Sequence, residues 1–318
     1  MKVTRAMVDA GLRSRYLPGR LMARLLHTSW FSPFALRMGR KKLAGRNQPG
    51  LDCREVFVPR DDGLRPLRTR VYAPLAASGP LPVMLYLHGG GYLHGVPEQF
   101  GSVIADFIAA QPCIVVAPDY RKASEAPFPA AFDDAWTCLL WLRDNATTLG
   151  GRNASVIVAG HSAGGGLAAA VTLKARDTGQ VTVALQVLAY PMLDDRGQTA
   201  SMRDNNAPVW DAIANARAWA QYLRGVSPVD AYAAPARATD VSGLPPTITY
   251  VGDIDPFADE TQAYADALRQ AGVPVTLAVY RGAFHAFDGL APKAAISRQA
   301  KQFLHDNFRS HVQRYLGE

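Results

Sequence analysis

Two short segments contain the residues best suited to catalysis. They are Gly-His-Ser-Ala-Gly at 160–164 and His-Gly-Gly-Gly at 88–91. The first fits the pattern G-x-S-x-G, in which a serine on a strained strand-to-helix turn exposes its hydroxyl at the edge of a sheet. The second fits a glycine-rich loop whose bare N–H groups form an oxyanion hole. Each segment follows an apolar run that is typical of a buried strand. Together, in this order, they predict acyl transfer through a serine.

Ser162 is the predicted nucleophile, and a serine hydroxyl needs a general base within hydrogen-bond reach. We expect His285 to be this base, because it follows the last predicted strand and completes the chain order Ser, Asp, His. His161 precedes the serine on a sharp turn, so its side chain should point away from Ser162. His88 opens the glycine loop and is expected to brace it. The other histidines considered are His27, His94, His305 and His311.

The acid that orients the base should follow the preceding strand, in residues 252–256. Asp255 and Asp253 compete for this role, and Asp194 is a more distant candidate. Asp255-Pro256 also predicts the start of a helix, with Asp near the N-cap and Pro in the first turn. The two roles can coexist, because the acid holds the tautomer of the imidazole and need not change its own protonation.

The predicted donors to the oxyanion are the N–H groups of Gly89, Gly90 and Ala163. Glycine is needed in the loop because a side chain would obstruct the approach of the substrate to the backbone. Tyr92, which follows the glycines, and Trp210, which lies in an aromatic stretch, are expected to contact the substrate.

Along most of the chain, predicted strands alternate with predicted helices. This alternation is typical of a mostly parallel sheet with helices on both faces. An opening pair of alternating strands surrounds a turn at Asp61-Asp62-Gly63. The predicted strands are 54–59, 67–74, 82–88, 113–118, 155–159, 182–189, 246–251 and 274–280. The predicted helices are near 97–110, 130–149, 163–177, 257–271 and 291–314.

Two segments fall outside this alternation. Residues 193–243 are too long for a bare loop and should contain helices of their own. Residues 1–50 are helical in parts, with Pro18 and Pro33 interrupting the pattern. We interpret 51–192 and 244–318 as a catalytic core, and the other two segments as a helical cap over the carboxyl edge of the sheet.

Charge and cysteine usage set bounds on partners and location. The net charge is +7, and residues 1–50 contain eleven Lys and Arg against one acid, Asp9. A solvated cap face is the favoured interpretation of this basic segment, with contact to acidic lipid or nucleic acid as the alternative. Three cysteines without tight spacing predict neither a disulfide framework nor a metal site, and they favour a reducing cytoplasm. We expect no signal peptide and no transmembrane helix.

On these motifs the chain resembles the hormone-sensitive-lipase-like family of α/β-hydrolase esterases. The matching segments are 88–92, 119–121, 127–134, 160–165, 255–260 and 285–287, in family order. The resemblance implies an eight-stranded sheet, an N-terminal helical cap segment and carboxylester hydrolysis without metal or cofactor. It also favours Asp255 over Asp253 as the acid.

One departure from the family pattern lies beside the nucleophile, where His161 replaces the usual Asp. As an imidazole, His161 is expected to titrate near pH 6.5 and to change the pH dependence of activity. A second departure is the stretch 120–125, Tyr-Arg-Lys-Ala-Ser-Glu, which does not touch the predicted triad.

The predicted function is hydrolysis of carboxylic esters of short to medium acyl chain through an acyl-enzyme intermediate. An amidase or deacetylase would use the same site, and a relative that binds its ligand without turnover is the alternative from a different class, since fold alone does not fix function. The expected partner is a small-molecule ester and not a nucleic acid. A weak contact of the basic N-terminus with a membrane surface and a homodimer are kept as alternatives.

Overall fold

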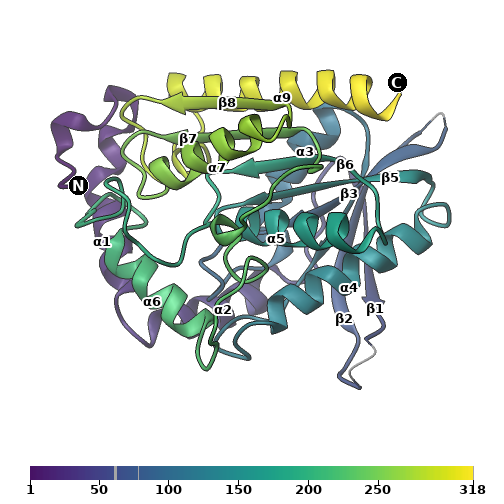
Figure 1. Ribbon diagram of the computed structural model, residues 1–318, viewed down its shortest axis with the longest axis horizontal. Coiled ribbons are helices and arrows are strands. Elements are labelled where there is room, and N and C mark those ends of the chain that lie inside the picture. The colour runs from purple at the N-terminus through teal and green to yellow at the C-terminus, as the bar shows by residue number, and fades with distance from the viewer. Residues whose placement is uncertain (61–62, 78, 318) are drawn as a thin grey trace.

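The computed structural model describes residues 1–60, 63–77 and 79–317, and these form one mostly parallel sheet covered by helices (Figure 1). Asp61 and Asp62 of the predicted turn lie outside the described residues. Within the described ranges the sheet has eight strands: β1 Leu51–Val58, β2 Leu67–Pro74, β3 Leu81–Leu87, β4 Ile114–Pro118, β5 Gly151–His161, β6 Val183–Ala189, β7 Thr247–Gly252 and β8 Val275–Tyr280.

The order of the strands across the sheet is β1-β2-β4-β3-β5-β6-β7-β8. β1 pairs with β2 and β2 with β4 in antiparallel fashion, and every later pair is parallel. β3 and β5 are central, with Leu87 opposite Gly160. Their carboxyl ends therefore lie side by side, and the two motif segments begin where these strands stop. The predicted mostly parallel sheet is confirmed.

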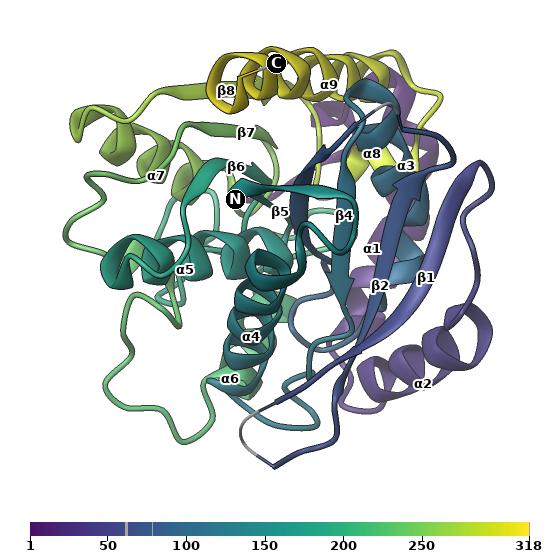
Figure 2. The same cartoon turned by 90° about the vertical axis from the view of Figure 1, so that its right-hand side faces the viewer.

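Successive side chains of a strand point to opposite faces of the sheet, and this alternation divides the core in two. In β3, Val83 and Leu85 pack on one face, whereas Met84 and Tyr86 pack on the other. The first face is covered by α4 Ala130–Asn145, α5 Ala163–Thr178 and α7 Ala258–Gln270, and the second by α3 Gly101–Ala110 and α9 Ala295–Leu316 (Figure 2). Both faces are apolar, as expected for parallel strands buried on each side.

The remaining helices are short or lie in the two segments outside the alternation. They are η1 Arg5–Met7, η2 Ala10–Arg15, α1 Tyr16–Leu26, α2 Phe31–Leu43, η3 Pro97–Phe100, α6 Ala212–Tyr222, η4 Pro235–Arg237 and α8 Phe287–Leu290. Pro18 and Pro33 lie in the first turns of α1 and α2, where a missing N–H costs no helical hydrogen bond. The two prolines therefore mark helix starts rather than interruptions.

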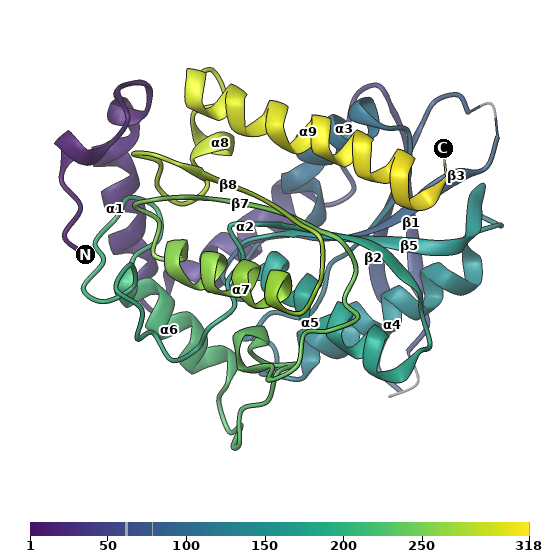
Figure 3. The same cartoon turned by 45° about the horizontal axis from the view of Figure 1, so that its top comes forward.

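The N-terminal segment and residues 193–243 meet at the carboxyl end of the parallel strands. Figures 1 and 3 show α1 and α6 together at the end toward which the arrows of β7 and β8 point. The N–H of Val209 donates to the carbonyl of Gly19 at 2.8 Å, and His27 Nε2 lies 2.9 Å from Asp211 Oδ1. In the described part of the chain, every helix is too short or too polar to cross a membrane.

Candidate active site

Ser162 occupies the single residue between β5 and α5, in a backbone conformation that an L-residue rarely adopts. Its φ is 58° and its ψ is −122°. The turn is sharp enough that a Cβ on Gly160 would lie 2.1 Å from the carbonyl oxygen of Gly164, and a Cβ on Gly164 would lie 2.0 Å from that of Leu87. Only glycine fits at these two positions, and this crowding holds the strained serine at the end of the strand.

The structure brings Ser162, His285 and Asp255 into one hydrogen-bonded chain. The Ser162 hydroxyl donates to His285 Nε2 at 2.8 Å, and His285 Nδ1–H donates to Asp255 Oδ2 at 2.8 Å. All three residues are buried. The other carboxylate oxygen of Asp255 accepts the N–H of Phe257 at 2.9 Å, so a local turn fixes the carboxylate before it meets the imidazole. This is the geometry of a nucleophile, a base and its orienting acid.

The two competing carboxylates are engaged elsewhere. Asp253 Oδ1 accepts the N–H of Gly282 at 2.6 Å and so shapes the loop after β8. Asp194 forms an ion pair with Arg196, with 2.7 Å between Oδ1 and Nε. Neither contacts His285 in the described structure, and the geometry therefore favours Asp255.

Gly89 and Gly90 follow β3 and face the nucleophile across the end of the sheet. A Cβ on Gly89 would lie 3.0 Å from the carbonyl oxygen of His161 and 3.4 Å from Ser162 Cβ. Gly90 has a φ of 131°, and a Cβ there would strike the carbonyl oxygen of His94 at 2.0 Å. Both glycines line the cavity in front of Ser162.

The N–H groups of Gly89, Gly90 and Ala163 have no acceptor among the described residues. Ala163 is the first residue of α5, so the positive end of that helix is directed at the same place. His88 braces the loop as expected, because its Nδ1–H donates to the Gly89 carbonyl at 2.8 Å. Its ring also stacks on Tyr120, with 4.3 Å between centroids. Three unused donors beside a serine can stabilise a negative oxygen.

A hydrogen-bonded group of buried side chains packs behind His285 and was not predicted from the sequence. The ring of Tyr190 lies edge-on to His285, with centroids 4.9 Å apart, and its hydroxyl donates to Asp288 Oδ1 at 3.1 Å. Tyr250 donates to the other oxygen of Asp288 at 2.7 Å. Asp288 comes three residues after His285. The same short segment therefore supplies the base and the carboxylate that fixes Tyr190, whose ring packs on the base.

The site opens into a cavity of about 470 Å³, within the range of small-molecule sites. Trp210 lines this cavity, and its ring lies against Gly91, where a Cβ would be only 2.2 Å away. Tyr92 does not line it: this ring is buried in the core and stacks on Tyr222 at 3.9 Å. The described residues contain no group of three or more side chains that could hold a metal ion.

Helix α2, in the segment predicted to belong to the cap, forms one wall of the cavity, although the sequence did not identify the residues that face it. The wall residues recur every four positions, so they share one face of the helix. They are Phe31, Ala35, Gly39 and Leu43, and Met22 and Leu26 of α1 continue the wall. The signal was present as apolar or small residues at i, i+4, i+8 and i+12, but the four Lys and Arg residues of α2 obscured it.

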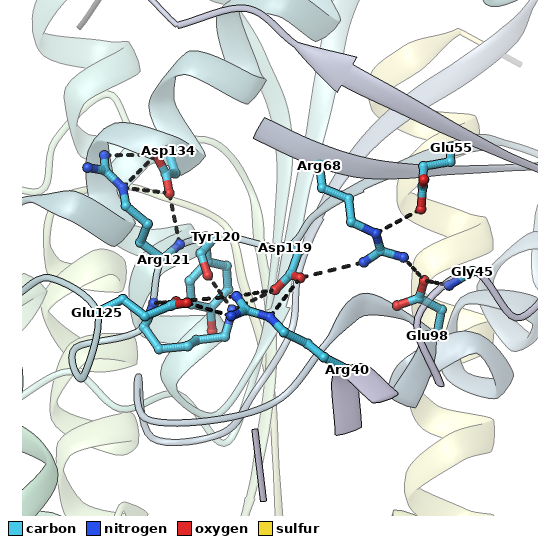
Figure 4. Close-up of polar contacts among 11 residues, drawn as sticks. Arg40, Gly45, Glu55, Arg68, Glu98, Asp119, Tyr120, Arg121, Glu125 and Asp134 are labelled. Carbon is cyan, nitrogen blue, oxygen red and sulfur yellow. Dashed lines mark hydrogen bonds and ion pairs between the residues drawn. The ribbon is translucent and has the colours of Figure 1, made fainter. Parts of the chain in front are cut away.

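A network of charges holds α2 on the core (Figure 4). Arg40 donates to Asp119 at 3.3 Å and to Glu125 at 3.2 Å, and the N–H of Gly45 donates to Glu98 at 2.7 Å. Burial opposes ionisation of Asp119, but the adjacent cations of Lys122 and Arg40 lower its pKa to about 2. The carboxylate therefore stays charged at neutral pH, and the wall of the cavity stays attached to the sheet.

His161 points away from Ser162, but the expected titration near pH 6.5 is wrong. Its Nδ1 lies 3.0 Å from the hydroxyl of Tyr86, on the face of the sheet opposite to α5. Burial lowers the pKa of His161 to about 4. The ring is therefore neutral at neutral pH, and it supplies no charge whose loss could change activity there.

Three buried neutral histidines predict a loss of stability in mild acid. Burial lowers the pKa of His94 and of His161 to about 4, and that of His88 well below its usual value. A histidine in the unfolded chain has a pKa of about 6.5. Between these values the unfolded chain binds more protons, so the free energy of unfolding falls as pH drops from about 6.5 toward 4. Each histidine contributes up to ~1.4 kcal/mol per pH unit in this window.

Urea unfolding at a series of pH values from about 7 down to 4.5 measures this slope. His161→Gln should have a shallower slope than the natural protein, by up to ~1.4 kcal/mol per pH unit, because one titrating group is removed. The glutamine amide can still pair with the Tyr86 hydroxyl. Equal slopes for the two proteins would contradict a neutral, buried His161.

Comparison with known proteins points to one family. Residues 84–289 match the family model described as the alpha/beta hydrolase fold. The chain is 37% identical over 222 residues to the carboxylesterase NlhH of Mycobacterium tuberculosis, covering 68% of this chain and 69% of that protein. It is 34% identical over 245 residues to the esterase LipI of the same organism, covering 76% and 77%. Among solved structures, a bacterial heroin esterase superposes with a TM-score of 0.87 at 34% identity, over 98% of this chain and 99% of the other.

Proposed function

Because the chain belongs to the alpha/beta hydrolase fold family, within its hormone-sensitive-lipase-like esterases, we propose that Ser162, His285 and Asp255 are its catalytic triad. The enzyme is a carboxylesterase, a serine hydrolase that acts on small-molecule esters. The observation that carries the assignment of residues is the pair of 2.8 Å hydrogen bonds through the two nitrogens of His285.

The reaction follows from the positions of these groups. Ser162 Oγ attacks the ester carbonyl while its proton passes to His285 Nε2. The carbonyl oxygen becomes an oxyanion that accepts from the N–H groups of Gly89, Gly90 and Ala163. His285 then returns the proton to the departing alkoxide, which leaves as an alcohol. The acyl group remains on Ser162 as an ester, and a water activated by His285 releases it as the acid.

Asp255 contributes by holding His285 in the tautomer that leaves Nε2 free to accept the serine proton. Its charge also stabilises the imidazolium that forms during each proton transfer. Because Asp255 is fully buried, this attraction is weakly screened by solvent. The strained backbone at Ser162 needs no rearrangement to present the hydroxyl, since the turn is already fixed by the glycines around it.

The acyl chain is proposed to lie along the inner face of α2. Phe31, Ala35, Gly39 and Leu43 give this wall an apolar surface with a shallow middle, since its two central residues are small. A Cβ on Gly39 would meet no atom within 4 Å. The free space there accommodates additional methylenes, and this supports a preference for short to medium chains.

Gly39→Leu should shorten the accepted acyl chain. The new side chain would occupy space for about two methylenes, each worth ~0.8 kcal/mol, so kcat/KM for long acyl chains should fall ~15-fold relative to acetate. The measurement is kcat/KM across p-nitrophenyl esters of increasing acyl length. Arg37→Leu makes the same side chain on the exposed outer face of α2 and should leave the profile unchanged. Unchanged profiles in both variants would place the acyl chain elsewhere.

Preference for esters over amides is tested by comparing a p-nitrophenyl ester with the matching anilide. We expect kcat/KM to be larger for the ester than for the anilide. A larger kcat/KM for the anilide would favour the amidase alternative. The cytoplasmic location, the homodimer and the contact with a membrane surface stay predictions. The cap formed by residues 1–50 and 193–243 is likewise a proposal, supported by the lining of the cavity.

A further inference from the structure

The outer face of the N-terminal helices exposes large apolar side chains to solvent. Leu17 and Leu21 of α1 are 73% and 61% exposed, and Trp30 and Phe34 at the start of α2 are 57% and 52% exposed. Their spacing of four residues puts each pair on one stripe of its helix. Single exposed apolar residues need no explanation, but a group of them in adjoining helices is typical of an interaction surface.

This apolar group adjoins the entrance of the catalytic cavity. Met22 of α1 and Leu290 of α8 both line the cavity and are more than two-fifths exposed, so they form part of its rim. The ring of Trp30 is edge-on to that of Phe31, with centroids 5.8 Å apart, and Phe31 lines the cavity. Apolar surface therefore continues from the outer face of α2 into the site.

The same stripes of α1 and α2 also carry Lys and Arg side chains that no carboxylate of the described residues neutralises. Arg24 lies seven residues after Leu17 on α1, and Arg37 and Lys41 continue the stripe of Trp30 and Phe34 on α2. Of the Lys and Arg side chains in residues 1–50, only Arg40 has a carboxylate partner in the described part of the chain. Aromatic and aliphatic side chains beside unpaired cations are typical of a surface that binds an anionic bilayer. The apolar side chains insert at the headgroup boundary, and the anionic headgroups attract the cations.

We propose that the outer face of α1 and α2 docks on an anionic lipid bilayer, with the entrance of the cavity at the bilayer surface. Figures 1 and 3 show α1 at one end of the molecule, where its outer face can approach a flat surface. A second copy of the chain is a poorer occupant, because an isologous contact would oppose two strongly basic segments. The proposal concerns binding and is independent of the catalytic assignments.

Sedimentation with vesicles tests the proposal. One set contains phosphatidylcholine alone, and the other contains equal parts of phosphatidylcholine and phosphatidylglycerol. We expect binding to the anionic vesicles that weakens as salt is added, and little binding to the neutral ones. Binding that is absent from both sets, or equal in both, would overturn the proposal.

Variants locate the surface. The double variant Leu17→Glu, Leu21→Glu should reduce partitioning onto anionic vesicles by at least about tenfold, because it replaces two anchors with repelled charges. Leu75→Glu is the matched control, since Leu75 is 74% exposed and follows the end of β2 that lies away from the cavity. Both variants should keep natural turnover of a soluble acetate ester. An equal loss of vesicle binding in the two variants would contradict the proposed docking on a bilayer. So would a dimer in solution that only the double variant dissociates, if the natural protein does not bind vesicles.

Discussion

Ser162→Ala should lower kcat for a p-nitrophenyl ester by about 10⁴- to 10⁶-fold while leaving the protein folded. The hydroxyl is the only nucleophile within 2.8 Å of His285 Nε2, among the described residues. Its removal leaves the oxyanion donors and the cavity in place, so the residual rate reflects these alone. The measurement is a steady-state rate with enough enzyme to detect slow turnover.

The control for this substitution is stability. Ser162→Ala removes only the hydroxyl oxygen and keeps the Cβ that lies nearest to Gly89, so the midpoint of thermal unfolding should change little. A folded variant that keeps activity within tenfold of the natural enzyme would rule out Ser162 as the nucleophile.

Asp255→Asn should cost about 10⁴-fold in kcat, because an amide can no longer hold His285 in the productive tautomer or stabilise the imidazolium. Asn is nearly isosteric with Asp, and its oxygen can still accept the N–H of Phe257, which now bonds Asp255 Oδ1. The loss should therefore appear in kcat and not in the stability of the fold.

Asp253→Asn provides the matched comparison. Asp253 precedes Asp255 by two residues, and its Oδ1 accepts the N–H of Gly282, a role that an amide oxygen can fill. We expect kcat within a few-fold of the natural enzyme. The two variants therefore differ only in which carboxylate is neutralised, and a larger loss in Asp253→Asn would reverse the assignment of the acid.

The alternation of strands and helices was predictable because parallel strands and their covering helices each leave a local pattern. The continuous apolar run of β5 and the glycines around Ser162 are examples, since both the strand and the sharp turn demand particular residue types locally. The predicted mostly parallel sheet and membership of the esterase family are confirmed. The residue roles within the triad and the oxyanion hole stay predictions.

What the sequence did not reveal depends on contacts between distant segments. The wall formed by Gly39 and its neighbours needs α2 to lie across the glycine loop, and ion pairs such as Arg40 with Asp119 hold it there. Tyr92 has a residue type suited to substrate contact, yet its ring turns into the core against Tyr222. The neutrality of His161 follows from burial on the second face of the sheet, which no local pattern encodes.

Covalent trapping of the nucleophile tests the central claim most directly. Incubation with diethyl p-nitrophenyl phosphate should release p-nitrophenolate, abolish esterase activity and add one diethylphosphoryl group per chain, with peptide mass mapping placing it on Ser162. Labelling should be absent in Ser162→Ala and much slower in Asp255→Asn. A phosphoryl group on another residue, or full labelling of folded Ser162→Ala, would contradict the proposed mechanism.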